Sequence, residues 1–193
     1  YEEQLELIGL NLKAGKKAKS STAYQPAFNF LKQGAEILLE NKWEMHYELC
    51  LEIYKELAEC EYLLTHFSEA DKLFAYILEN AKTPLDKISV IHIQLRQKTS
   101  EQKGEEAFRI GFEVLEQFGF KLPDLNKPET TQMLFMEQLG EYKQLLAERP
   151  IASLFDLPEM SDPKMKEAIS MITNLGDIAI LLKSEMLPLM SIL

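Results

Sequence analysis

The chain has 193 residues, 46% of them hydrophobic and 27% charged, which is the balance of a folded globular protein. Its formal net charge of −10 predicts no nucleic-acid partner, because phosphates repel an acidic surface. The apolar run Ile178 to Leu182 is far shorter than the roughly 20 residues that cross a bilayer, and the first residues are too charged for a secretory signal. We therefore expect a cytoplasmic location and no membrane insertion.

Apolar residues recur at steps of three and four through the first two thirds of the chain, a spacing that predicts amphipathic helices. Ser68 is the expected N-cap of one helix, Thr83-Pro84 separates two helices, and Gly119 is the expected C-cap of another. No stretch alternates as a strand would. The expected helical stretches are residues 26–39, 43–58, 68–81, 85–95 and 105–118.

Three of these helices carry an alanine near the start, at Ala27, Ala70 and Ala107, with spacings of 43 and 37 residues. Small side chains are needed where two helix axes approach to about 8–10 Å. Tetratricopeptide repeats, which are helix–turn–helix units, recur at about 34 residues. We therefore predict an all-α, tetratricopeptide-like superhelix of antiparallel helix pairs over residues 1–127. An irregular all-α bundle is the alternative.

The pattern then changes, which predicts a separate C-terminal helical extension over residues 128–193. One long helix is expected over 128–149, followed by a non-helical crossing that is rich in proline. Asp162 is the expected N-cap of a last long helix, with Pro163 in its first turn. A second, short helix is expected around Glu185.

The final segment, residues 180–193, is apolar on too many sides for a solvated helix. It is either a core helix cut off from its neighbours or a helix that pairs between chains. Both interpretations predict exposed apolar surface and possible self-association. Because the sequence begins without methionine and inside a helical pattern, we expect it to be a segment of a longer protein, with the extension truncated at its end.

Several ordered phrases resemble one helical region of a known family. They are LNLKAGKKAKSSTAYQPAFNFLKQGAEIL, HYELCLEIYKELAECEYL, FSEADKLFAYILENAKTPLDK, GEEAFRIGFEVLEQFGFKLP and LFDLPEMSDPKMKEAISMI. They are similar to the tetratricopeptide-like segment of large bacterial multi-sensor signalling kinases, and to the segment just beyond it. In that family a serine/threonine kinase-like domain and a STAND-type ATPase precede the helical array, and GAF and histidine kinase domains follow.

The resemblance covers residues 9 to 190. The kinase and ATPase motifs of the family have no counterpart in this sequence, so the resemblance implies a place in an architecture and not an activity. It also offers another interpretation of the stretch GLNLKAGKK, residues 9–17, which looks at first like a phosphate-binding loop.

A phosphate-binding loop needs four residues between its glycines and a Ser or Thr after the lysine. Here five residues separate Gly9 from Gly15, and Lys17 stands at the hydroxyl position. We interpret the stretch as the turn of the first helix pair, in which Gly15 ends a helix and Ser20 or Ser21 caps the next.

Nothing in the sequence predicts a metal or another cofactor. Cys50 and Cys60 lie on one expected helix, about 15 Å apart along its axis, which is too far for a disulfide, so both are expected to be reduced. No histidine has a glutamate three residues before it, and no two are spaced i, i+4. We therefore expect no metal site at His46, His66 or His92, and we expect His46 to pack at a helix–helix crossing.

No catalytic group is predicted either. Ser161 and Lys164 match a Ser-x-x-Lys acylating pair, but its partner signatures are absent and Asp162-Pro163 is a routine helix start. Four glutamates of one helix are interpreted as a solvated face with i, i+4 partners, since nothing sequesters a pair for acid–base catalysis. They are Glu52, Glu56, Glu59 and Glu61.

Aromatic side chains recur at helical spacing between Trp43 and Tyr76 and are expected mainly to pack within and between repeats. Helical solenoids bind partners on a concave surface, which the first helix of each pair usually lines. By this analogy Trp43, Tyr47 and Tyr54 are the predicted groove-lining interaction residues.

The predicted function is a noncatalytic scaffold and protein-interaction segment of a bacterial signal-transduction kinase, with proteins or neighbouring domains of the same chain as partners. The alternative is the superhelical, inducer-binding sensor of a STAND-type transcription activator, which an aromatic pocket closed at one end would favour. A helical hydrolase or metalloenzyme would need converging histidines and carboxylates, and no spacing here produces them.

Overall fold

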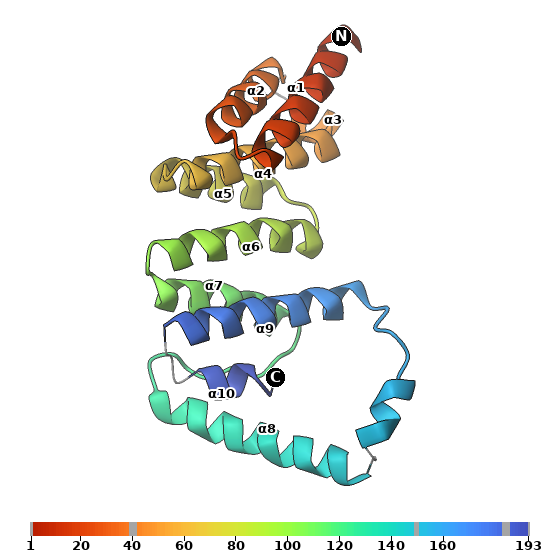
Figure 1. Ribbon diagram of the computed structural model, residues 1–193, viewed down its shortest axis with the longest axis vertical. Helices are drawn as coiled ribbons and strands as arrows, with labels where there is room; N and C mark the ends of the chain where they lie inside the picture. Colours follow the sequence, from red (N-terminus) through yellow and green to blue (C-terminus); the bar gives the residue numbers. More distant parts are fainter. Residues whose placement is uncertain (1, 39–41, 149–150, 183–185, 193) are drawn as a thin grey trace. The chain divides into compact units, whose positions relative to one another are not determined.

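The computed structural model describes residues 2–38, 42–148, 151–182 and 186–192, and every regular element in these ranges is helical. The predicted all-α fold class is confirmed. None of the described helices is long and apolar enough to cross a membrane. In chain order they are α1 (Glu2–Ser20), α2 (Tyr24–Ile37), α3 (Lys42–Met45), α4 (Tyr47–Leu63), α5 (Phe67–Asn80), α6 (Pro84–Ser100), α7 (Gly104–Gln117), α8 (Pro128–Glu148), the 3-10 helix η1 (Ile151–Asp156), α9 (Pro163–Leu181) and α10 (Leu187–Met190) (Figure 1).

The chain divides into two compact units, Tyr1–Gln97 and Lys98–Leu193. The first holds α1 to α5 and most of α6, and the second holds the end of α6 and the helices from α7 onward. The boundary predicted after residue 127 falls inside the second unit. The predicted boundary marks the end of the helical repeats, whereas the boundary between the compact units marks a change in packing. The end of the repeats at residue 127 stays a prediction.

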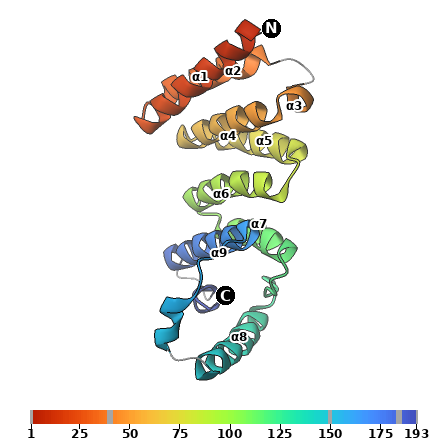
Figure 2. The ribbon, with the colours of Figure 1, turned by 90° about the vertical axis from the view of Figure 1, so that its right-hand side faces the viewer.

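The first unit consists of two helix hairpins followed by one long helix (Figures 1 and 2). α1 packs along α2, α4 packs along α5, and α2 lies against α4. A single buried core runs through these helices, with Leu31, Ile53 and Phe74 fully enclosed. Val90 and Ile93 bring α6 into the same core.

One turn geometry joins α1 to α2, α4 to α5 and α6 to α7. In each turn one residue has left-handed backbone geometry: Thr22 (φ 59°), Thr65 (φ 64°) and Gln102 (φ 60°). The amide of the next residue donates to the carbonyl five positions before it: Ala23 to Ala18, His66 to Glu61, and Lys103 to Lys98. This combination is the Schellman ending of a helix, which turns the chain sharply.

An alanine without exposed surface stands five positions after each left-handed residue: Ala27, Ala70 and Ala107. The amide of each alanine donates to the carbonyl of the residue just after the left-handed one. The alanine spacing seen in the sequence is therefore the spacing of three equivalent helix–turn–helix units.

Several predicted helix ends were wrong. α1 does not end at Gly15 but continues to Ser20. A Cβ on Gly15 would lie 2.5 Å from Cγ of Leu31, so the crossing of α1 with α2, and not a turn, requires glycine there. The N-cap of α2 is Ala23, without a side-chain hydrogen bond, so neither Ser20 nor Ser21 caps it.

The beginnings of α4 and α5 also differ from the prediction. The helix expected from residue 43 is interrupted at His46, which separates α3 from α4. α5 begins at Phe67, so Ser68 lies inside the helix, and His66 is its N-cap. The Schellman turn sets the start of α5, and it needs no capping side chain.

In the second unit α9 packs against α7, and α10 packs against both α9 and α8. A Cβ on Gly111 of α7 would lie 2.8 Å from both Cδ atoms of Leu175, so glycine lets α9 approach closely. The predicted start of α9 is confirmed, since the Asp162 carboxylate accepts from the amide of Lys164 and Pro163 follows the cap. Gly119 follows α7 with φ 87°.

One expectation after residue 149 needs correction, because the crossing expected to be non-helical contains η1. The expected short last helix is present as α10, which begins at Leu187, and Glu185 lies outside the described residues.

Candidate functional site

The three predicted groove residues lie together, and Tyr76 of α5 joins them. The Trp43 ring centroid is 5.8 Å from that of Tyr47 and 5.9 Å from that of Tyr54. The Tyr76 centroid lies 5.8 Å from Trp43 and 5.0 Å from Tyr54, both edge-on. We call these four residues the aromatic cluster. It joins α3, α4 and α5, and each such ring pair contributes about 0.5–1.5 kcal/mol beyond its buried area.

Two polar groups of the aromatic cluster, the Trp43 indole N–H and the Tyr54 hydroxyl, form hydrogen bonds with Tyr76 and with the neighbouring Lys42. The indole N–H of Trp43 donates to the Tyr76 hydroxyl at 2.8 Å. The Lys42 ammonium donates to the Tyr54 hydroxyl at 2.6 Å and lies 4.9 Å from the centre of that ring. Burial favours the neutral amine, but the tyrosine hydroxyl outweighs it, and the pKa of Lys42 is raised. The cation thus holds the short helix α3 onto α4.

The third polar tip, the Tyr47 hydroxyl, reaches the start of α6. It donates to the Asp86 carboxylate at 2.7 Å and accepts from the backbone N–H of Lys82 at 2.8 Å. Asp86 also accepts from the amide and hydroxyl of Thr83, whose hydroxyl accepts from the Asp86 amide. This reciprocal arrangement is a capping box. Burial alone would raise the pKa of Asp86. The hydrogen bonds to its carboxylate outweigh burial, and the pKa is lowered.

The aromatic cluster is therefore a bonded patch between helices, in which Tyr54 is buried and the other three rings are half-buried. The structure brings the three predicted residues together, and their role in binding stays a prediction. Lys42 and Asp86 were not predicted from the sequence. The string Thr83-Pro84-Leu85-Asp86 has the spacing of a capping box and could have identified Asp86, whereas no local signal marks Lys42.

The face of α4 that was interpreted as solvated carries ion pairs to other helices. Lys19 of α1 pairs with both Glu56 and Glu59, and Arg96 of α6 pairs with Glu59 at 2.8 Å. Lys16 of α1 and Glu52 of α4 form a further ion pair, which is more exposed to solvent. We call these residues the charge ladder: Lys16, Lys19, Glu52, Glu56, Glu59 and Arg96.

The solvated-face interpretation was wrong, because Glu56 and Glu61 are buried. Burial favours the neutral amine of Lys19, but its hydrogen bonds to Glu56 and Glu59 raise its pKa. Glu52, Glu56 and Glu59 thus pair with side chains of α1 and α6.

The cysteines of α4 and His66, the N-cap of α5, are the next reactive side chains. Cys50 and Cys60 are buried on α4 and form no disulfide, and burial raises the pKa of the Cys60 thiol to about 12, so the thiol is unreactive at neutral pH. His66 lies 2.8 Å from the Glu61 carboxylate. Among the described residues, no three His, Cys, Asp or Glu side chains are grouped so that they could hold a metal ion.

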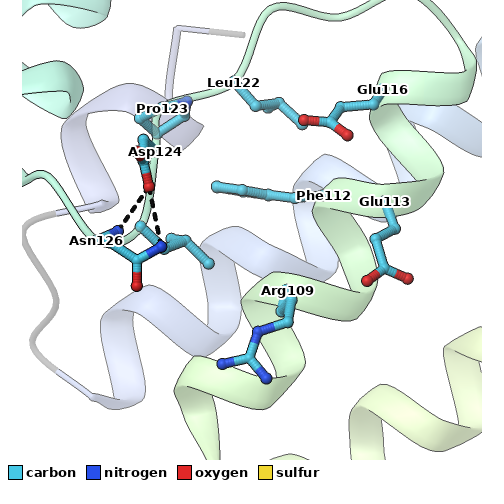
Figure 3. Close-up of a pocket in the computed structure, with 9 residues that line it drawn as sticks. Arg109, Phe112, Glu113, Glu116, Leu122, Pro123, Asp124 and Asn126 are labelled. Carbon is cyan, nitrogen blue, oxygen red and sulfur yellow. Dashed lines mark hydrogen bonds between the residues drawn. The ribbon is translucent and has the colours of Figure 1, made fainter.

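A surface pocket of about 430 Å³ opens in the second unit, between α7 and the loop that follows it. Figure 3 shows Phe112 of α7 pointing toward this loop, where the Asp124 carboxylate accepts from the backbone and side-chain N–H groups of Asn126 at 2.9 Å and 3.1 Å. These hydrogen bonds lower the pKa of Asp124. Arg109, Glu113 and other residues of α7 complete the wall. This pocket was not predicted from the sequence.

The chain is 28% identical over 166 residues to a protein of Dictyostelium discoideum named hybrid signal transduction histidine kinase G. The match covers 80% of this chain, which spans 5% of the length of that protein. No family model and no solved structure matches the chain. The similarity relates the chain to a small region of a signal-transduction kinase. That relative is not bacterial, so the bacterial origin stays a prediction.

Proposed function

We propose that this chain is a noncatalytic, tetratricopeptide-like segment of a large signal-transduction kinase, and that it holds and couples neighbouring ATPase and sensor domains in the cytoplasm. The observation that carries the proposal is the set of three helix–turn–helix units with one turn geometry and one buried alanine position. Repeats of this kind offer extended surfaces to other proteins. The relationship to a histidine kinase favours a signalling role.

In this proposal residues 1–127 supply the binding surface and residues 128–193 form a helical extension. The half-buried rings of Trp43 and Tyr47 are available to a partner, while the buried Tyr54 ring stacks on Trp43. The extension exposes Ile180 and Leu181, which agrees with the expected apolar surface. These two residues would carry the proposed self-association.

The inducer-binding alternative receives less support. It needs aromatic rings that surround an empty space, whereas the rings of the aromatic cluster pack on one another. The pocket in Figure 3 has one aromatic ring, Phe112, among charged and aliphatic residues.

The test is to delete residues 1–193 in frame from the full-length kinase and to measure autophosphorylation with and without the stimulus. We expect the deletion to leave ATP-dependent phosphorylation in place and to abolish its response to the stimulus. The 193-residue chain alone should neither hydrolyse ATP nor take up phosphate. Phosphate transfer by the isolated chain, or a deletion that keeps the full response, would refute the proposal.

A further inference from the structure

One stripe of α1 is exposed although its equivalent on α4 is buried. Counted from the left-handed residue of each turn, Leu7 and Leu10 occupy the positions of Cys50 and Ile53. Cys50 and Ile53 have no exposed surface, whereas Leu7 is 49% and Leu10 is 58% exposed. Two large apolar side chains thus face solvent at positions that the next unit encloses.

The correspondence continues along both helices. Ala14 and Lys17 of α1 take the positions of Leu57 and Cys60, which are again buried. We call Leu7, Leu10, Ala14 and Lys17 the open stripe. On α6, Lys87 stands exposed at the position of Leu7, but the position of Leu10 is Val90, which is again fully buried. In the second and third units the position of Leu10 is therefore an interior position.

α2 is the helix that covers this position on α4. A Cβ on Gly34 of α2 would lie 2.6 Å from Cδ1 of Ile53, so α2 passes over Ile53 with a small residue. The ion pairs of Lys16 with Glu52 and of Lys19 with Glu59 show that α1 and α4 run in the same direction. Because α2 is antiparallel to α1, a covering helix runs antiparallel to the helix beneath it.

The two ends of the open stripe carry opposite charge. Glu3 and Glu6 are exposed at the N-terminal end of α1, and Lys13 and Lys17 are exposed toward its C-terminal end. An antiparallel helix would meet the lysines with its first turn and the glutamates with its last. Acidic residues in the first turn and basic residues in the last also suit the helix dipole.

We propose that the open stripe is the docking site of a partner α-helix, which packs on Leu7 and Leu10 antiparallel to α1 as α2 packs on α4. The partner helix presents glycine or alanine over Leu10, aliphatic residues beside it, acidic residues in its first turn and basic residues in its last. This inference rests on the proposed role in protein binding and names the kind of partner.

A second copy of this chain is the competing occupant that the experiment must separate from another protein. Two helical glycines have open space beside them, Gly9 of α1 and Gly140 of α8, since an added Cβ would meet nothing within 4 Å at either. The docking mode is the insertion of an amphipathic helix onto an apolar stripe, with anchors at spacings of three and four residues.

The probe is a fluorescent, hydrocarbon-stapled peptide with the sequence of α2, extended by glutamates before it and lysines after it. Titrated with the 193-residue chain, it should bind with a Kd below about 100 µM. Leu10→Lys should weaken binding by about tenfold or more, because the anchor can no longer be buried. The matched control Leu145→Lys, at a leucine 61% exposed in the second unit, should leave peptide binding unchanged.

Two peptide variants sharpen the test. Replacing the glycine that corresponds to Gly34 by leucine should block docking, and exchanging the glutamates and lysines should weaken it. The inference would be overturned if the peptide did not bind at chain concentrations up to about 1 mM, or if Leu10→Lys left its affinity unchanged. So would dimerisation of the chain that Leu10→Lys abolishes, since a second copy would then be the occupant. These are binding measurements, so their failure is distinct from a failure in the phosphorylation assay.

Discussion

At the scale of single residues, the helix–turn–helix units depend on backbone strain. Thr22, Thr65 and Gln102 all have left-handed geometry, and none of them is glycine. A side chain in this conformation costs about 1 kcal/mol or more, because Cβ crowds the following carbonyl. The Schellman hydrogen bonds of each turn hold the strained conformation in place.

Thr65→Gly should therefore stabilise the first unit. We expect a gain of about 0.5–1 kcal/mol, since relief of the strain exceeds the added entropy of the unfolded chain. The measurement is urea unfolding followed by the fluorescence of Trp43, which is the single tryptophan and lies in this unit. Thr65→Ala is the control, because it removes the same exposed side chain without the conformational freedom. An equal gain from alanine would mean that strain is not the cause.

Tyr47→Phe should destabilise the first unit by about 1–2 kcal/mol at pH 7, because the hydroxyl donates to a charged carboxylate. The folded-state pKa of Asp86 is lowered, so its contribution is present above the unfolded pKa of about 4 and is lost as the pH falls through the folded value. The cost of the substitution should therefore shrink toward pH 3. Unfolding of both proteins across this pH range checks it, and a cost that stays constant would contradict the assignment.

At the scale of elements, the sequence predicted what lies within one helix better than what joins two. Apolar periodicity predicted the helices, and the spacing of Ala27, Ala70 and Ala107 predicted the equivalent units. Gly15 and Glu56 were misread because their partners, Leu31 and Lys19, lie on other helices. Of the candidate site, local spacing suggested the three ring positions but could not show that they would meet.

The crossing of α1 with α2 can be tested with two glycines of one helix. Gly9→Ala and Gly15→Ala gain the same helix propensity, about 1 kcal/mol. A Cβ at Gly9 meets nothing within 4 Å, whereas at Gly15 it meets Cγ of Leu31 at 2.5 Å. We expect Gly15→Ala to be less stable than Gly9→Ala by about 1–3 kcal/mol, the usual cost of overpacking. Equal stabilities in urea unfolding would show that the crossing tolerates a methyl group.

The charge ladder offers a second matched pair on α1. Lys19→Met should cost about 2 kcal/mol or more, because it leaves the buried Glu56 without its cation. Lys16→Met breaks a pair in which both side chains are largely exposed and should cost less than about 0.5 kcal/mol. Added salt should leave the Lys19 effect nearly unchanged, since buried pairs are poorly screened. A Lys19 effect that disappears in salt would mean that the ladder is a surface feature.

At the scale of the whole molecule, the two compact units imply two unfolding events. Leu175 of α9 has no exposed surface and lies over Gly111, so Leu175→Ala should destabilise the second unit by about 2–5 kcal/mol. Trp43 reports only on the first unit, whereas far-UV circular dichroism reports on the helices of both. We expect the substitution to lower the midpoint of one dichroism transition and to leave the Trp43 transition in place. If both midpoints fell together, the units would unfold as one, and a partner bound to the first could then influence the second through stability alone.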